Sequence, residues 1–282
     1  MKFKLTVVTV TYRRNQGELR LFINSFKRFN DLESQARLII VDNSPDDYRD
    51  VEKLIREYND IDYIYNPSNP GFGASNNIGF NKYVSDYVLF VNNDVEFTEV
   101  LFTNLINYFA DKPKLGCIGI HQTGGAASYY ANILAPSRCD MTVFNDKFHF
   151  ISGAFMFFKS NVFNEIGRFD PNIFMYGEEF DISLRLREKG YYTEFLPNYS
   201  FWHKVGNRSK NFSAKRFNES TKSYCYILKK YNISSEIAYR KVRCLQVRFI
   251  YNLFLFRFNN CKHILQAISE TKNIINENFR LI

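Results

Sequence analysis

Short apolar runs alternate with segments of helical periodicity over the first 110 residues of this 282-residue chain. The pattern predicts strands at residues 5–10, 37–42, 61–66 and 87–91. It predicts helices at 16–29, 48–58 and 100–109, and one that opens within 69–77 and runs to about residue 83. Strands and helices in this alternation are typical of βαβ units. The sequence therefore predicts an α/β, Rossmann-like fold, with a mostly parallel sheet and helices on both of its faces.

The remainder of the chain has a different pattern. Residues 115–160 have little helical periodicity, and we expect antiparallel strands and loops that extend the parallel core. A helix is predicted at 178–189, ended by Gly190, and residues 213–280 are almost wholly helical in pattern. We expect two domains: an α/β domain at 1–210 and a basic helical C-terminal extension at 211–282.

The cysteines and the hydropathy of the sequence indicate the cellular compartment in which the protein resides. The five cysteines include no Cys-x-x-Cys pair, which indicates free thiols in a reducing environment. No run approaches the roughly 20 apolar residues that span a bilayer. The apolar run near the N-terminus is short and Thr-rich for a signal peptide. We therefore expect a cytoplasmic protein.

The net charge of +8 is unevenly distributed. Residues 1–202 contain 21 Lys and Arg against 25 Asp and Glu, whereas residues 203–263 contain 14 Lys and Arg against two Glu. A basic segment of this kind favours an anionic partner, such as a membrane surface, a nucleic acid or a pyrophosphate. The alternative is a solvated helix surface. No recognised nucleic-acid motif accompanies the charge, and we expect no nucleic-acid partner.

A carboxylate follows the apolar strand at 87–91 in the tetrapeptide Val91-Asn92-Asn93-Asp94. Open α/β sheets bind ligands at the carboxyl ends of their strands, and Mg²⁺ is often held by one carboxylate together with substrate phosphates. Asp94 is therefore a candidate metal ligand. The alternative is an ordinary polar turn, in which Asn and Asp are common.

Two more strand ends carry polar groups where a nucleotide can lie, at residues 9–13 and 42–44. The carboxylate of Asp42 can accept a hydrogen bond from a pyrimidine imide or from a ribose hydroxyl. The Gly-rich segment 71–75 at a predicted helix start offers backbone N–H groups to an anion. Asn76 stands where a dinucleotide fingerprint needs its third Gly, and the segment follows the third strand, so we reject that fingerprint.

Adjacent carboxylates, Glu178 and Glu179, open the predicted helix at 178–189. Helix dipoles favour acidic residues there, so the pair can be purely structural. A carboxylate directed into a cleft can instead deprotonate a hydroxyl nucleophile. Asp181 and Arg185, four residues apart, are expected to pair on the helix surface.

His203 follows the only Trp of the chain and precedes a segment rich in hydrogen-bond donors. A lone His is more often structural than a ligand. Here the following loop can close over a pyrophosphate, with His203 meeting a metal held by Asp94. Lys204 and Arg208 lie in that loop and are expected to face the diphosphate.

These segments together resemble glycosyltransferase family 2 of the GT-A fold, and particularly its bacterial rhamnosyltransferase-like branch. The matching stretches are VTVTYR at 8–13, VDNS at 41–44, NPGFGASNN at 69–77, FVNND at 90–94, SGA at 152–154, GRFD at 167–170, YGEEFD at 176–181, and His203. Each is weak alone, but eight in this order over residues 5–209 are specific.

The resemblance implies a nucleotide-sugar donor, a divalent Mn²⁺ or Mg²⁺ on its diphosphate, and inverting attack by an acceptor hydroxyl. The implied donor-binding residues are Thr9, Tyr12, Arg13, Asp42, Asn43, Gly71, Asn77, Asn93, Lys204 and Arg208. The implied metal ligands are Asp94 and His203, and the implied acceptor-binding residues are Ser152, Gly153 and Tyr176.

Two positions depart from the family pattern. Glu179 stands where the general base is usually Asp; we favour Glu179 as the base, with Glu178 as the rival. Asn92 stands where the metal motif usually has its first Asp, which predicts weak metal binding in the absence of donor.

The expected reaction is therefore sugar transfer to a bacterial surface-polysaccharide or lipid-diphosphate-linked acceptor. Deoxythymidine diphosphate rhamnose is the first choice of donor, followed by a uridine diphosphate hexose or galactofuranose. The main alternative is a non-catalytic nucleotide-sugar-binding or scaffold protein of the same fold. A sugar-phosphate nucleotidyltransferase is a further alternative, but it would carry a Gly-rich loop just after the first strand, and this sequence has none there. The C-terminal helices are expected to form core or homodimer contacts, or to contact the anionic inner face of the plasma membrane.

Overall fold

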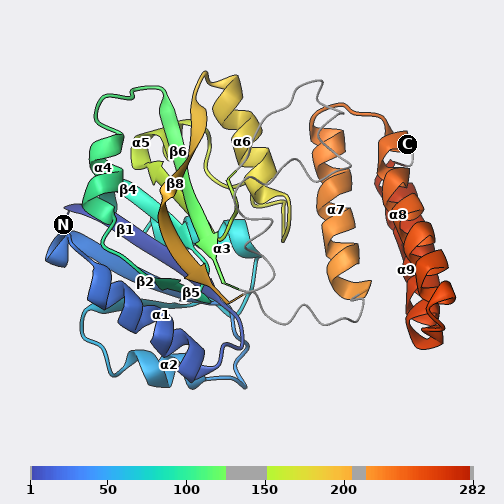
Figure 1. The fold of residues 1–282 in the computed structure, drawn as a ribbon, viewed down its shortest axis with the longest axis horizontal. Helices are drawn as coiled ribbons and strands as arrows, with labels where there is room; N and C mark the ends of the chain where they lie inside the picture. The colour runs from blue at the N-terminus through green and yellow to red at the C-terminus, as the bar shows by residue number, and fades with distance from the viewer. Residues whose placement is uncertain (1, 125–150, 205–213, 280–282) are drawn as a thin grey trace. The chain divides into compact units, whose positions relative to one another are not determined.

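The computed structural model describes residues 2–124, 151–204 and 214–279. The chain forms two compact units (Figure 1). The sheet unit contains Met1–Ala135, His149–Pro171 and Glu178–Val205. The helical unit contains Pro136–Phe148, Asn172–Gly177 and Gly206–Ile282. A short segment from the middle of the sequence, Asn172–Gly177, thus belongs with the C-terminal residues.

An eight-stranded sheet forms the centre of the sheet unit, in the order β3-β2-β1-β4-β7-β6-β8-β5. Its strands are β1 (Lys2–Thr11), β2 (Ala36–Asp42), β3 (Ile61–Tyr65), β4 (Val84–Val91), β5 (Val95–Phe97), β6 (Leu115–Thr123), β7 (Phe155–Lys159) and β8 (Tyr192–His203). Neighbours pair in parallel from β3 through β4 and between β6 and β8, and antiparallel in the other three pairs.

Helices cover both faces of the sheet (Figure 1). Successive residues of β1 point to opposite faces, so Val7 belongs to one hydrophobic cluster and Val8 to the other. The cluster of Val7 includes side chains of α1 (Gln16–Phe29), α2 (Asp50–Ile55) and α4 (Phe102–Tyr108). The cluster of Val8 includes side chains of α3 (Phe72–Phe80), α5 (Ser160–Glu165) and α6 (Glu178–Glu188). The predicted α/β fold is confirmed.

Helix α3 lies very close to the sheet because Gly79 has no side chain. A Cβ atom at this position would lie 2.4 Å from Val8 Cγ1, which is closer than carbon atoms can approach. The same helix approaches Phe169 at Gly73, where a Cβ would lie 2.8 Å from Phe169 Cβ. The glycines of this segment therefore allow close packing of α3.

The predicted elements up to residue 109 are all present, with helix ends shifted by a few residues. The expectation of antiparallel strands within 115–160 is confirmed for β6 and β7, and residues 125–150 lie outside the described part. Strands β5 and β8 and helix α5 were not predicted. β8 contains Pro197, which is typical of strand edges and irregularities, and its register against β6 shifts there, between Leu196 and Ser200.

The helical unit contains α7 (Ala214–Lys230), α8 (Ser235–Phe254) and α9 (Phe258–Phe279), as the helical pattern of residues 213–280 predicts. Tyr224 and Leu228 of α7 pack with Val242 of α8 and Ile275 of α9. Within this unit Ser223 Oγ donates to the carbonyl of Met175 at 2.8 Å. Among the helices that the structure describes, none combines the length and apolar character needed to cross a membrane.

Candidate active site

The carboxyl ends of β1, β2 and β4 meet at one edge of the sheet. The backbone N–H of Asn43, after β2, donates to the carbonyl of Thr11 at 2.9 Å. The side-chain amide of Asn93, after β4, donates to the carbonyl of Val10 at 2.6 Å. The three strand ends that the sequence singled out are therefore in contact, at the edge where ligands bind in α/β sheets.

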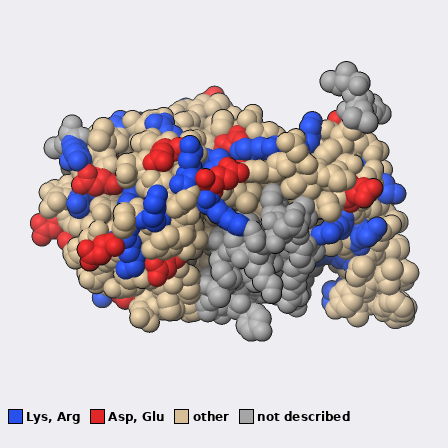
Figure 2. Space-filling view, turned by 90° about the horizontal axis from the view of Figure 1, so that it is seen from above, with Lys and Arg blue, Asp and Glu red and all other residues tan. Residues whose placement is uncertain are grey.

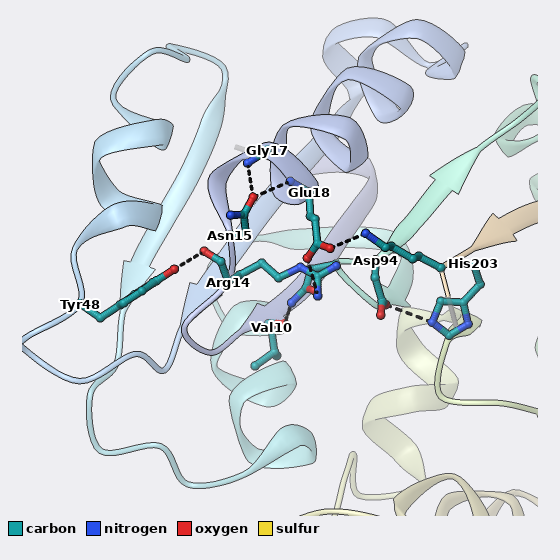
Figure 3. A network of polar contacts seen from close by, with 10 residues as sticks. Val10, Arg14, Asn15, Gly17, Glu18, Tyr48, Asp94 and His203 are labelled. Carbon is teal, nitrogen blue, oxygen red and sulfur yellow. Dashed lines mark hydrogen bonds and ion pairs between the residues drawn. The ribbon is translucent and has the colours of Figure 1, made fainter. Parts of the chain in front are cut away.

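Asp94 and His203 come together at this edge (Figure 3). The short strand β5 begins directly after Asp94 and pairs with β8, in a register that places Val95 opposite His203. The backbone N–H of Lys204 donates to the carbonyl of Asp94 at 2.9 Å. As a result His203 Nε2 lies 3.0 Å from Asp94 Oδ1, although the two residues are 109 positions apart.

His203 and Arg14 both influence the Asp94 carboxylate. Burial raises its pKa, but the hydrogen bond and charge of His203, together with the charge of Arg14, outweigh this effect and leave the pKa below the ordinary value. The buried Nε and Nη2 of Arg14 have no hydrogen-bond partner among the described residues. Arg14 is therefore a partly buried cation whose Nε and Nη2 groups are available to donate hydrogen bonds to an anion.

The side-chain atoms of Asp94 and His203 that face each other are suitable ligands for a divalent metal ion. A carboxylate oxygen and an imidazole nitrogen are both ligands for first-row divalent metals. An ionised carboxylate can only accept a hydrogen bond, so Nε2 of His203 is the donor to Asp94, while the buried Nδ1 has no hydrogen-bond partner within the described ranges. Within residues 2–124, 151–204 and 214–279, no three His, Cys, Asp or Glu side chains form a metal-binding group. The pair thus fits a cation whose other ligands are phosphate oxygens and water.

Glu18 of α1 connects two cations beside this pair (Figure 3). Its carboxylate lies 2.5 Å from Lys204 Nζ and 3.2 Å from Arg14 Nη1. The hydrogen bond from Lys204 is the main reason that the pKa of Glu18 lies below its ordinary value. Lys204, predicted to face the diphosphate, is thus paired with a carboxylate in this structure.

Arg13 and Arg14 have different surroundings although they are adjacent. Arg13 has a left-handed backbone (φ 47°), and its guanidinium pairs with Asp47 at 3.2 Å on the exposed surface. Arg14 lies beside Glu18 and influences Asp94. Arg13 as a donor-binding residue remains a prediction. Arg14 was missed, because nothing in the pair Arg13-Arg14 indicates which side chain points to the edge.

Asp42 is completely buried, with hydrogen bonds to both carboxylate oxygens. Tyr63 donates its hydroxyl to Oδ2 at 2.9 Å, and the backbone N–H of Ser44 donates to Oδ1 at 3.0 Å. Burial and this hydrogen bond to Asp42 raise the pKa of Tyr63. A nucleoside contact by Asp42 remains a prediction; the structure itself gives this side chain a role in holding β2 to β3.

Asn43 holds the Gly71 segment against the strand ends. Its buried amide group donates to Ser75 Oγ at 2.7 Å and to Asn69 Oδ1 at 3.2 Å, while its Oδ1 accepts from Asn66 Nδ2 at 2.9 Å. Gly71 caps α3 with φ 102°, a conformation that favours glycine. Asn43 and Gly71 therefore lie together at the sheet edge.

Two of the predicted donor-binding residues are engaged within the fold. Asn77 donates to the carbonyl of Phe169 at 2.8 Å and accepts from its N–H at 3.2 Å. Thr9 is completely buried in β1. Tyr12, in contrast, is exposed at the end of β1. Donor contacts by these residues remain predictions.

Glu179 lies beside the Ser152-Gly153-Ala154 turn. A Cβ at Gly153 would be 3.6 Å from Glu179 Oε1, an ordinary contact distance, so the carboxylate lies directly against this turn. The same turn is joined to the end of β4, where the N–H of Asn92 donates to the carbonyl of Ala154 at 3.2 Å. Glu179 is partly accessible whereas Glu178 is buried, which favours Glu179 for contact with a substrate.

The predicted pairing of Asp181 with Arg185 is confirmed, but its predicted place on the helix surface is wrong. Asp181 is completely buried and accepts from Arg185 Nη2 at 2.7 Å and Nε at 2.9 Å. Arg185 also donates to the carbonyl of Ile166. The pair fixes α6, which begins with Glu178 and Glu179, to the end of α5.

Of the predicted acceptor residues, Ser152 and Gly153 lie in the sheet unit and Tyr176 in the helical unit. Ser152 Oγ accepts from the N–H of Ala154 at 3.3 Å. Tyr176 is exposed and has a left-handed backbone (φ 69°). Arg208 lies outside the described residues.

The protein is thus an α/β protein whose sheet carries carboxylates, an imidazole and cations at the carboxyl ends of its strands, the edge at which sheets of this class bind ligands. The sequence model of Glycosyl transferase family 2 matches residues 6–167, more than half of the chain, and that of Glycosyl transferase family group 2 matches residues 96–258. The chain belongs to glycosyltransferase family 2.

Individual proteins agree with this assignment. The chain is 24% identical over 237 residues to rhamnosyltransferase WbbL of Escherichia coli (strain K12), a match that covers 74% of this chain and 88% of that protein. Its fold is similar to that of mannosyltransferase PcManGT from Pyrobaculum calidifontis, in complex with GDP-Man and Mn²⁺ (TM-score 0.62, 11% identity, 99% of this chain and 87% of that one).

It is also similar to GalNAc-T7 with UDP, GalNAc and Mn²⁺ (TM-score 0.61, 16% identity, 80% of this chain and 48% of that one). At such identities the structural likeness shows the fold alone, which is GT-A.

Proposed function

We propose that this glycosyltransferase is metal-dependent and inverting, and that it moves rhamnose from a deoxythymidine diphosphate donor to a hydroxyl group of a surface polysaccharide or lipid-diphosphate-linked glycan. The similarity to a rhamnosyltransferase supports the sugar. The observation that carries the proposal is the meeting of Asp94 and His203, 3.0 Å apart, at the edge where β1, β2 and β4 end. A uridine diphosphate hexose or galactofuranose is the next choice of donor.

In this proposal Asp94 and His203 hold Mn²⁺ or Mg²⁺ together with the donor diphosphate. When bound, the cation neutralises charge that develops on the departing diphosphate. Similar folds with Mn²⁺ support this choice of ion. Arg14 offers unpartnered N–H donors beside Asp94, and Lys204 can exchange Glu18 for a phosphate oxygen. Both therefore favour the diphosphate product electrostatically.

The reaction is a single displacement at the anomeric carbon. The acceptor oxygen forms a bond to that carbon from the face opposite the diphosphate, and the bond from the carbon to the diphosphate oxygen breaks. Glu179 accepts the proton of the acceptor hydroxyl, and the nucleoside diphosphate leaves. Glu179 suits this role because it is partly accessible and its carboxylate lies beside Gly153, one of the predicted acceptor residues.

Thermal melting of the full chain with a panel of nucleotide diphosphates and nucleotide sugars, with and without Mn²⁺ or Mg²⁺, tests the donor site. The proposal expects a metal-dependent rise in melting temperature with one nucleoside, followed by sugar release or transfer with the corresponding donor. A rise that is the same without metal contradicts the metal site, and a rise with uridine but not deoxythymidine compounds contradicts the choice of donor.

A further inference from the structure

The turn between α8 and α9 exposes an unusual number of apolar side chains. Sixteen large hydrophobic residues are exposed in the described part of the chain, and nine of them lie between positions 247 and 265. Phe254 and Phe256 are 78% and 79% exposed, and Phe258 is 61% exposed. The others are Val247, Ile250, Tyr251, Leu253, Leu255 and Leu265. Concentrations of this kind mark interaction surfaces in soluble proteins.

This turn has a defined structure. Asn252 is buried; its carbonyl accepts from the N–H of Arg257 at 3.0 Å, and its side-chain oxygen accepts from Asn260 Nδ2 at 3.2 Å. Phe256 has a left-handed backbone (φ 53°), and its ring lies 6.3 Å from that of Phe258, edge to face. The exposed rings are thus presented by a hydrogen-bonded reversal of the chain.

The exposed residues of α8 lie on a different face from its core residues. Val242, Leu245 and Phe249 pack within the helical unit, Leu245 with Ile264 and Ala267 of α9. Of the apolar stripe that the sequence singles out at 242, 245, 249 and 253, only Leu253 is exposed. Val247, Ile250, Tyr251 and Phe254 follow the spacing i, i+3, i+4, i+7 and form a second, outward apolar face.

The charge around this surface is of one sign. No Asp or Glu occurs between Glu236 and Glu270, whereas six Lys and Arg do, of which Arg243, Arg248, Arg257 and Lys262 are exposed. On the face of the protein drawn in Figure 2, in contrast, acidic and basic side chains are interspersed over much of the surface. A second copy of the chain, docking through the same patch, would bring these cations against each other. An anionic surface would complement them.

We propose that the α8–α9 turn docks on the surface of a bilayer that contains anionic phospholipids. The rings of Phe254, Phe256 and Phe258 enter the headgroup region, and Arg243, Arg257 and Lys262 contact lipid phosphates. This docking does not depend on the proposed transferase reaction, although it would place the enzyme beside a lipid-linked acceptor.

Flotation of the full chain with vesicles tests the proposal without any substrate. The vesicles contain phosphatidylcholine alone, or phosphatidylcholine with about one third phosphatidylglycerol. The unaltered protein should float with the anionic vesicles, at least about tenfold more tightly than with the neutral ones, and rising salt should weaken its binding. Equal binding to both vesicles, or no binding to the anionic ones, overturns the proposal whatever the variants do.

Three variants identify the surface. The Phe variant combines Phe254→Ser, Phe256→Ser and Phe258→Ser. The cation variant combines Arg243→Gln, Arg257→Gln and Lys262→Gln. Each should weaken binding about tenfold or more. Leu21→Ser with Tyr192→Ser, which changes exposed apolar residues of the sheet unit, should leave it unchanged. Because the substituted side chains are exposed, all three should melt near the unaltered protein. Unchanged binding by the Phe variant overturns the proposal.

Sedimentation velocity without lipid separates docking from self-association. The proposal expects the Phe variant and the unaltered protein to have the same mass in solution. A dimer that dissociates in the Phe variant would show that a second copy covers this surface, and would overturn the proposal.

Discussion

The imidazole of His203 lies 3.0 Å from the carboxylate of Asp94 because β8 pairs with the short strand β5 that follows Asp94. The contact thus depends on a strand register and on two side chains from distant parts of the sequence. If the pair holds the cation on the donor, either substitution should disable the site while the strands remain paired.

Asp94→Asn and His203→Ala should each remove the metal-dependent rise in melting temperature on donor addition, and reduce transfer by about 100-fold or more. Melting curves with and without Mn²⁺, and a transfer assay, measure the two effects. Asp47→Asn is the matched control, since Asp47 is an exposed carboxylate paired with Arg13. A metal-dependent rise that survives in both site variants would exclude this pair as the ligands.

Glu179→Gln should reduce transfer by about 10²–10⁴-fold while donor and metal still raise the melting temperature, because only the proton acceptor is removed. Glu179→Asp should retain part of the activity, since the carboxylate is kept. Glu178→Gln tests the rival base: if Glu178→Gln reduces transfer by this factor and Glu179→Gln has no effect, the assignments of the two residues must be exchanged.

Arg14→Met should reduce transfer by about 100-fold, because a positive charge with unpartnered donors beside Asp94 is lost. Arg20→Met provides the comparison, since that guanidinium pairs with Glu57 at the exposed surface. We expect Arg20→Met to change transfer much less. Equal losses in both variants would mean that the position next to Asp94 gives Arg14 no particular role.

Much of this arrangement could be predicted from the sequence, for identifiable reasons. The strands that end at Asp42 and Asp94 are continuous apolar runs, as buried parallel strands usually are. β5 has only three residues and β8 contains Pro197, so neither has a recognisable strand pattern. The order of the motifs therefore predicted that His203 approaches Asp94. The pairing of β5 with β8, which brings the two residues together, was not predicted.

Burial was harder to predict than pairing. The spacing of Asp181 and Arg185 indicates an ion pair, but the same spacing occurs on exposed and buried helix faces. Ile182 and Leu186 show only that α6 has an apolar side. What buries Asp181 is the packing of α6 in the sheet unit, and no local pattern contains that information.

Arg185→Met should lower the free energy of unfolding by about 3 kcal/mol, because the buried Asp181 carboxylate loses the two N–H groups that donate to its Oδ2. Arg56→Met is the control, since Arg56 forms an exposed pair with Glu52, and we expect a loss of about 0.5 kcal/mol or less. Urea unfolding at neutral pH measures both. Similar losses would contradict the difference in burial between the two pairs.

The lowered pKa of Asp94 predicts a pH dependence of stability. His203 and Arg14 outweigh the effect of burial, so the folded protein holds the Asp94 proton less tightly than the unfolded chain, whose reference pKa is 3.8. The ionised carboxylate therefore stabilises the fold above this pH, and the contribution is lost as pH falls through the lower folded value. The stability difference between the unaltered protein and Asp94→Asn should be present at about pH 5 and narrow below 3.8. A difference that persists unchanged at pH 3 would contradict this origin, as urea unfolding across these pH values would show.

The membership of Asn172–Gly177 in the helical unit has a consequence for cutting the protein into fragments. Ser223 holds the carbonyl of Met175, Asn172 donates to the hydroxyl of Tyr226 at 3.2 Å, and a Cβ at Gly177 would lie 2.8 Å from Ile227 Cδ1. All three contacts are made by α7, and the next residue along the chain is Glu178. A fragment that ends before α7 would release the stretch leading into the two glutamates, and should be cleaved there first by a protease. A shortened enzyme for inhibitor screening should therefore retain α7, together with α8 and α9, whose side chains pack on it.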